Sequence, residues 1–347
     1  MAVLTLGILA LLSISNSVAP SSRDAPRWSE TKANEWYGHQ GWLVGCNFIP
    51  STAINELEMW QADTFDLPTI DRELGWAHGI GMNTARIFLH DLAWSQDPKG
   101  FKHRLDEVLG VAKKHHIKPM LVLFDSCWNP DPKIGKQPES VVGVHNGGWL
   151  QCPGAKSEQD PTSWPALRQY VQDIVHSFRN DSRVLMWDVY NEPRKEALPL
   201  LKESFQWVRE AKPSQPISSG VFGGDAHITE FQLLASDVTT CHQYGDATAL
   251  TAFLDSLPKV RPVICTEWMA RSIGSRVQTN LPIFKERHVG CLNWGLVYGK
   301  TQTIYPWGSK PGAPEPNPWF HDLFRKDGTP FDPKEIHLFR ALTGTSE

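Results

Sequence analysis

The sequence predicts an α/β protein with one domain, a (β/α)8 or TIM barrel. Short apolar or β-branched runs alternate with longer amphipathic stretches, which is typical of repeated βα units joined into a parallel sheet. Eight such units fit the length of 347 residues, and we expect the barrel domain to span residues 21–347. An open doubly wound sheet is the alternative, but no glycine-rich dinucleotide fingerprint follows the first strand run.

Eight short runs have the composition of buried parallel strands. They span residues 43–47, 84–89, 119–125, 184–190, 217–221, 238–242, 263–267 and 291–296. Other stretches repeat apolar residues every three or four positions, as on one face of a helix. We expect these helices at residues 68–79, 101–115, 164–179, 197–212, 248–257, 277–287 and 333–342.

Two connections are unusually long and rich in loop-forming residues. They are residues 126–163 after the third strand and 297–317 after the eighth strand. Both therefore lie on the face that carries the functional residues in barrels of this kind.

Charge and composition restrict the class of protein. The chain has 34 basic and 38 acidic side chains and a net charge of −4, so we expect no nucleic-acid partner. Fifteen tryptophans against six tyrosines indicate either a large core or flat platforms for a ligand with apolar faces, such as a sugar ring. We expect ligand contacts from the tryptophans in strand-end loops, Trp60, Trp94, Trp128, Trp149, Trp268 and Trp307. We expect core packing from Trp76, Trp164, Trp187 and Trp207.

The amino terminus resembles a secretory signal peptide. Residues 3–12 are apolar and small residues follow, so we expect residues 1–20 to be removed and the protein to be secreted or periplasmic. No Lys or Arg precedes the run, which leaves a truncated gene start or a plain tail as alternatives. No other stretch reaches 18 uninterrupted apolar residues, so we expect no membrane span, and we expect a monomer.

Four of the six cysteines lie in or beside strand runs and are expected to be small buried residues, namely Cys46, Cys241, Cys265 and Cys291. Cys127 and Cys152 lie at the ends of a loop-like segment, so a disulfide between them stays open. No Cys or His spacing typical of zinc occurs, and we expect neither a metal nor a cofactor.

Two predicted strands end in a glutamate. Glu192 follows the fourth strand in the sequence Asn191-Glu192-Pro193, and Glu267 ends the seventh strand. Strand ends of a parallel barrel share one face, so the two carboxyls converge there. Such a pair allows one carboxyl to act as an acid and the other as a nucleophile, which is the chemistry of glycosidic bond cleavage. The alternative is that each glutamate only caps a helix or pairs with an arginine.

These motifs resemble the (β/α)8 retaining glycoside hydrolases of clan A, and most closely glycoside hydrolase family 5. The resemblance covers residues 41–342. It implies that Glu192 is the acid/base, that Glu267 is the nucleophile and that Asn191 binds the 2-hydroxyl of the reacting sugar. It also implies double displacement with retained configuration.

Further positions match the same family. The resemblance implies that Arg86 lies under the nucleophile and that Trp294 is the floor beneath the reacting sugar. His242 and Tyr244 match a His-x-Tyr motif whose phenol bonds the nucleophile. We expect Arg86 and Tyr244 to keep Glu267 ionised, and this negative charge to raise the pKa of Glu192.

The chain departs from the family pattern after the third strand. Many family 5 members carry a histidine there, whereas this chain reads Phe124-Asp125-Ser126-Cys127-Trp128. Asp125 either takes the polar role or caps the following loop. We expect Trp128 and His145 of the long loop to contact sugar.

The expected substrate is a β-linked poly- or oligosaccharide of plant type. An endo-acting glycanase is slightly favoured, and an exo-acting glycosidase or a transglycosylase with the same site are alternatives. A non-catalytic sugar-binding barrel would typically have lost one carboxylate. A metal-dependent barrel hydrolase would need His-x-His after the first strand, where this chain has Cys46-Asn47-Phe48.

Overall fold

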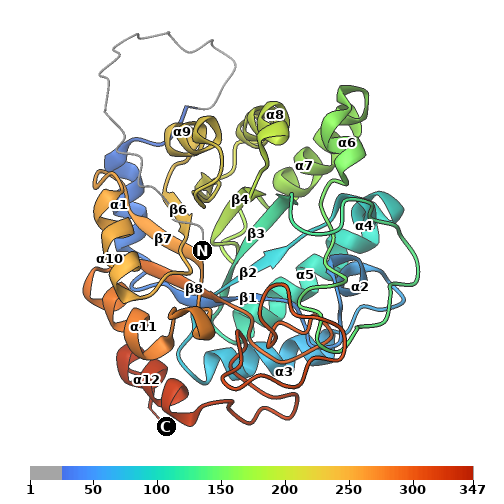
Figure 1. Cartoon of the computed structure of the whole chain (residues 1–347). Coiled ribbons are helices and arrows are strands. Elements are labelled where there is room, and N and C mark those ends of the chain that lie inside the picture. The colour runs from blue at the N-terminus through green and yellow to red at the C-terminus, as the bar shows by residue number, and fades with distance from the viewer. Residues whose placement is uncertain (1–25, 347) are drawn as a thin grey trace.

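A computed structural model describes residues 26–346 of the chain. Eight parallel strands form a nearly closed barrel surrounded by helices (Figure 1). The strands are hydrogen-bonded in the order β5-β4-β3-β2-β1-β8-β7-β6, and one parallel bridge between Val221 and Cys241 joins β5 to β6. The predicted (β/α)8 barrel is therefore confirmed.

All eight predicted strands are present within a few residues. They are β1 (Val44–Phe48), β2 (Thr84–Phe88), β3 (Lys118–Asp125), β4 (Met186–Asn191), β5 (Ile217–Ser218), β6 (Thr239–His242), β7 (Val263–Trp268) and β8 (Gly290–Trp294). The helices predicted between or after them are α3 (Leu67–His78), α5 (Pro98–Lys114), α7 (Trp164–Phe178), α8 (Leu198–Glu210), α10 (Ala247–Ser256), α11 (Val277–Glu286) and α12 (Pro333–Thr343).

The structure also has helices that the sequence pattern did not predict. They are α1 (Glu30–Gly38), α2 (Glu56–Trp60), α4 (Asp91–Gln96), α6 (Ala155–Gln159) and α9 (Ala226–Ala235). In α9 the apolar residues are spread around the helix, since Ile228 is fully buried whereas Leu234 is 63% exposed. This helix therefore has no clear apolar face for a periodicity search to detect. The predicted fifth strand was too long, because only two of its five residues join the ladder.

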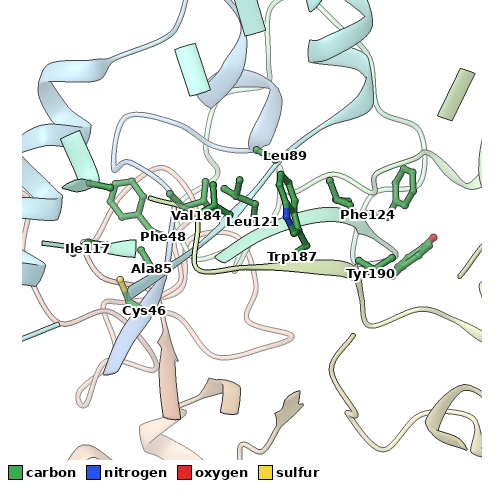
Figure 2. Packing of buried hydrophobic residues seen from close by; sticks show 14 of the residues in the cluster. Cys46, Phe48, Ala85, Leu89, Ile117, Leu121, Phe124, Val184, Trp187 and Tyr190 are labelled. Carbon is green, nitrogen blue, oxygen red and sulfur yellow. The ribbon is translucent and has the colours of Figure 1, made fainter. Parts of the chain in front are cut away.

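Strand residues alternate between the barrel interior and the helix layer, as the period of a strand requires. Outward side chains such as Cys46, Ala85, Leu121 and Trp187 belong to one large hydrophobic cluster with the surrounding helices (Figure 2). The intervening interior positions carry polar side chains at mid-barrel, and these support the site described below.

The amino-terminal end of the barrel is closed by α1. Its residues Ala33 and Tyr37 pack with Leu43, Met120 and other residues near the strand beginnings in a separate buried cluster. This apolar plug leaves the carboxyl ends of the strands as the face on which a ligand site can form.

Among residues 26–346, no helix combines the length and apolar character needed to cross a bilayer. The expected signal peptide at residues 1–20 lies outside the described residues.

Candidate active site

Glu192 and Glu267 meet at the carboxyl ends of β4 and β7, as the parallel topology predicts. Carboxylate oxygens of both residues and one imidazole nitrogen of His242 lie within 4.8 Å of one another. Glu192 immediately follows β4 with a φ of 40°, a left-handed conformation that is unusual for a residue other than glycine. Such strain is common where a side chain must be aimed at a functional site.

Glu267 is held on both oxygens by strong donors. Arg86 Nη1 donates to Oε1 over 2.6 Å, and the Tyr244 hydroxyl donates to Oε2 over 2.8 Å. The Glu267 side chain is only 5% exposed. Its orientation is therefore set by two neighbours from opposite sides of the barrel.

Arg86 is the centre of a buried polar network. Its Nε and Nη2 approach Asp188 Oδ2 at 2.9 and 2.8 Å, and Nη2 donates to Asn191 Oδ1 over 2.7 Å. Nη1 also donates to Asn47 Oδ1 over 2.9 Å. Because Arg86 is fully buried, these partners offset the loss of its hydration.

Glu192 has weaker partners and more solvent. His242 Nδ1 lies 2.8 Å from Oε1, and the Cys127 thiol donates to Oε2 over 3.4 Å. A thiol is a weak donor, and the Glu192 side chain keeps 28% of its surface exposed. Asn191, between the two glutamates, donates through Nδ2 to Asp125 Oδ1 over 2.9 Å.

The structure contradicts the expected raised pKa of Glu192. Burial disfavours its charged form, but the hydrogen bond and positive charge of His242 outweigh burial and lower the pKa. For His242, burial opposes protonation, but the charges of Glu267 and Glu192 win and raise its pKa. Burial raises the pKa of Glu267, with the charge of Glu192 adding to the effect, although His242, Arg86 and Tyr244 oppose it.

A cavity of about 410 Å³ opens over these groups. Seven of the residues predicted for the site line it, namely Asn191, Glu192, Tyr244, Glu267, Trp294, Trp128 and His145. The other lining residues are Ser126, Cys127, Asn146, Arg194, Phe222, Trp307 and His321. The volume falls in the range of small-molecule sites, which is roughly 300 to 1,000 Å³.

The three remaining predicted residues lie behind the cavity wall. Arg86 and His242 contact the glutamates, whereas Asp125 is buried and contacts neither. Asp125 Oδ1 accepts from the Cys127 main-chain N–H, and Oδ2 accepts from Trp149 Nε1. Its interpretation as a substrate-binding residue is therefore wrong, because it supports the loop and Asn191 from below, and burial raises its pKa to about 6.

Only some of the loop tryptophans reach the cavity. Trp128 and Trp307 are 42% and 44% exposed, and both line it. Trp60, Trp94, Trp149 and Trp268 are buried, so their expected role as open platforms is wrong. Trp149 instead packs against Trp294, with ring centroids 5.5 Å apart, and supports that floor.

Cys127 and Cys152 do not form a disulfide, and all six cysteines are free thiols. The Cys152 thiol donates to Asp91 Oδ1 and to the Leu123 carbonyl oxygen, whereas the Cys127 thiol faces Glu192. The other four cysteines are buried, as predicted.

The sequence interpretation missed several residues of the site. Asn47 and Asp188 complete the Arg86 network, and His321 lines the cavity. A charged residue inside the apolar strand around Asp188 was a visible signal, since a buried charge requires a partner. Nothing in the sequence around His321 distinguishes it from other loop histidines.

Within the described residues, two groups bring three possible metal ligands together: Glu192 with His242 and Glu267, and His90 with Asp91 and Cys152. In the first group each Glu267 oxygen already accepts from Arg86 or Tyr244. In the second, His90 Nδ1 accepts from the Leu92 main-chain N–H as a helix cap.

Comparison with known families and sequences points to glycoside hydrolases. A family model described as "Glycosyl hydrolases family 2, TIM barrel domain" matches residues 142–289, a segment that contains both glutamates. Mannan endo-1,4-beta-mannosidase A of Emericella nidulans is 28% identical over 91 residues, which are 26% of this chain and 21% of that protein. The chain thus matches only a minor part of that relative's length.

Solved structures share the fold over most of the chain. An exo-beta-1,4-mannosidase from Opitutaceae bacterium strain TAV5 is 18% identical with a TM-score of 0.60, covering 87% of this chain and 60% of that one. An endo-beta-1,4-mannanase from Thermotoga petrophila is 16% identical with a TM-score of 0.59, covering 89% and 77%. A GH5_18 protein from Streptomyces cattleya, in complex with Manb1-4GlcNAc, is 13% identical with a TM-score of 0.58 or 0.59 in two structures.

The fold is thus that of (β/α)8-barrel glycoside hydrolases. The resemblance to the family 5 type, predicted from the strand-end motifs, is confirmed.

Proposed function

We propose that this protein is a retaining β-glycoside hydrolase with Glu267 as nucleophile and Glu192 as acid/base. The carboxylate separation carries the proposal, because oxygens of the two residues lie within 4.8 Å. Retaining enzymes place these carboxyls about 5 to 5.5 Å apart, whereas inverting enzymes need about 6.5 to 9.5 Å to admit a water molecule.

In the first step, Glu267 attacks the anomeric carbon while Glu192 protonates the leaving oxygen. Arg86 and Tyr244 hold both Glu267 oxygens, so the carboxylate is oriented before the sugar arrives. The bond to the leaving group breaks as the glycosyl-enzyme ester forms. In the second step, Glu192 takes a proton from water, and that water releases the sugar with retained configuration.

His242 supplies the means to protonate Glu192. In the free protein, His242 Nδ1 and Glu192 Oε1 are 2.8 Å apart and share a proton that favours the imidazole. A sugar in the cavity would cover the exposed part of Glu192 and disfavour its charged form. The proton would then move to the carboxyl, from which the leaving oxygen takes it.

The relatives indicate the sugar. The matching sequence and the solved structures named above are a mannosidase, mannanases and a protein complexed with a mannosyl disaccharide. We therefore propose β-linked mannosides as substrates. Trp294 would form the floor under the reacting mannose, and Asn191 would bond its 2-hydroxyl. Secretion remains a prediction of the sequence.

The test is hydrolysis of aryl β-mannoside, mannooligosaccharides, aryl β-glucoside and aryl β-xyloside by wild type and Glu267→Ala. We expect cleavage of the mannosides by wild type only, with the first product in the β configuration by NMR. Glu230→Gln, at an exposed position on α9, is the matched control and should behave as wild type. An α-configured first product, or an active Glu267→Ala, would refute the mechanism.

Exhaustive chelation is a second test of the same assignment. We expect unchanged activity, because both Glu267 oxygens and Glu192 Oε1 are satisfied by protein groups. A loss restored by added Zn²⁺ would instead favour a metal at the Glu192, His242 and Glu267 cluster.

A further inference from the structure

From the shape of the cavity we infer that the protein is exo-acting and removes single sugars from the non-reducing end. This inference rests on the proposed glycosidase function and deepens it. The sequence slightly favoured an endo-acting enzyme, and a closed pocket was the stated alternative. The structure shows where the cavity ends and which loops end it.

The position of Glu192 sets the direction of the substrate. The acid/base lies beside the leaving group, so the leaving group occupies the side of β4 and β5, where Arg194 and Phe222 line the cavity. The attacked sugar lies between Glu267 and Trp294. Any further sugar on its non-reducing side would have to extend past Trp294 toward β8 and β1, which stand opposite β4 in the barrel.

A three-loop wall closes that side. It consists of residues 51–55 after β1, residues 143–148 after β3 and residues 299–312 after β8. Main-chain hydrogen bonds join the loops: Asn146 N–H donates to Thr301 O over 2.8 Å, Gly312 N–H to Val142 O over 2.8 Å and Lys300 N–H to Ser51 O over 3.1 Å. Side chains add to them, since Asn55 Nδ2 donates to Gly148 O and His145 Nδ1 to Tyr305 O.

Glycines allow the loops to approach this closely. A Cβ at Gly299 would lie 2.5 Å from Ser51 Cα, and a Cβ at Gly143 would lie 2.5 Å from the Lys310 carbonyl oxygen. Gly143 also has a φ of 89°, which favours glycine. The wall is therefore built by main-chain contact between loops rather than by side chains that could swing aside.

The space left behind Trp294 is too small for a sugar. A separate void lined by Asn146, Trp294 and Thr301 measures about 10 Å³, which is room for about one water molecule. Asn146 and Thr301 are themselves buried. The leaving-group side differs, because Trp128, which is 42% exposed, lines the cavity there beside Cys127 and can stack on a sugar that projects into solvent.

The wall also carries polar groups for the terminal sugar. His145 donates from Nδ1 to a main-chain carbonyl, and burial lowers its pKa to about 4, so its Nε2 is a neutral acceptor. A free hydroxyl at the non-reducing end can donate to such an acceptor, whereas a glycosidic oxygen in mid-chain cannot. The ligand class is thus a β-mannoside with an unsubstituted terminal mannose.

The experiment compares nitrophenol release from aryl β-mannoside and aryl β-mannobioside. An exo-acting enzyme releases nitrophenol from the mannoside at once, but releases it from the mannobioside only after a lag in which free mannose appears. Mannopentaose reduced at its reducing end should give mannose and reduced mannotetraose first. Immediate nitrophenol from the mannobioside, or mannobiose among the first products, would overturn the inference.

The outcome separates this inference from the proposed sugar. If the mannosides are not cleaved, the substrate proposal fails, and the same comparison is run with glucoside and cellobioside or with xyloside and xylobioside. A lag with the accepted disaccharide supports the closed pocket whichever sugar is accepted. Inactivity on all six compounds overturns the inference, because a pocket built for a terminal sugar must then accept none.

Discussion

The two carboxylates of the site differ in how firmly the protein holds them. Glu267 lies at the end of a buried network and accepts from a guanidinium and a phenol. Glu192 is half open to the cavity and accepts from an imidazole and a thiol. The difference teaches how one fold assigns two roles: the nucleophile needs a fixed position, and the acid/base needs a proton that can leave and return.

Removing each carboxylate should have the largest effect and should separate the two roles. We expect Glu192→Ala and Glu267→Ala each to lose roughly 10³-fold or more in activity. Azide should restore turnover of an activated aryl glycoside by either variant, but with different stereochemistry. Glu192→Ala should form the glycosyl azide of retained configuration, and Glu267→Ala the inverted azide. NMR of the product distinguishes them, and the same configuration from both variants would contradict the assignment.

Breaking the network below Glu267 should cost both stability and activity. Arg86→Met leaves Asp188 and Glu267 as buried carboxylates without their cation, and we expect about 3 to 5 kcal/mol lower free energy of unfolding. Denaturant unfolding measures it. Arg168→Met, which removes a surface ion pair with Glu210, is the control and should cost less than about 1 kcal/mol. Equal losses would show that the network is not special.

Removing one donor from Glu267 should shift a pH profile. The Tyr244 hydroxyl favours the ionised carboxylate, so Tyr244→Phe should raise the pKa of Glu267. Because the nucleophile must be ionised, the acidic limb of kcat/KM should move to higher pH, with a loss of roughly tenfold at neutral pH. Tyr37→Phe removes a hydroxyl at the opposite end of the barrel and should leave the profile unchanged. An unmoved acidic limb in Tyr244→Phe would count against Glu267 as nucleophile.

Changing the donor to Glu192 should have the smallest effect and the opposite location. The Cys127 thiol slightly favours the ionised carboxylate, so Cys127→Ala should raise the pKa of Glu192 and Cys127→Ser should lower it. Glu192 must be protonated to act, so the basic limb of kcat/KM should move up for alanine and down for serine, by roughly half a unit. Movement of the acidic limb instead would place the thiol's influence on Glu267.

The contrast between the two carboxylates shows the limits of sequence interpretation. The motif ending β4 and the glutamate ending β7 predicted which residues meet, because parallel strands of a barrel end on one face. The motif did not predict their protonation. That depends on His242 lying 2.8 Å from Glu192 and on the cysteine that replaces a more usual residue after β3, and both are contacts between distant segments.

Tryptophan roles were harder to predict for a similar reason. A tryptophan in a strand-end loop is compatible with an open platform or with packing under the loop. Trp128 and Trp307 are open, whereas Trp60 and Trp268 are fully buried. The choice depends on what covers each ring, and the covering segments come from elsewhere in the chain.

The sequence by itself determined the barrel, the order of its strands and the placement of both glutamates at one face. These features follow from local patterns repeated along the chain and from the geometry of parallel strands. Only the tertiary structure decided the partners of each carboxylate and the wall behind Trp294. Those depend on long loops that meet through main-chain hydrogen bonds, and main-chain groups are the same for every residue type, so no sequence pattern records which of them pair.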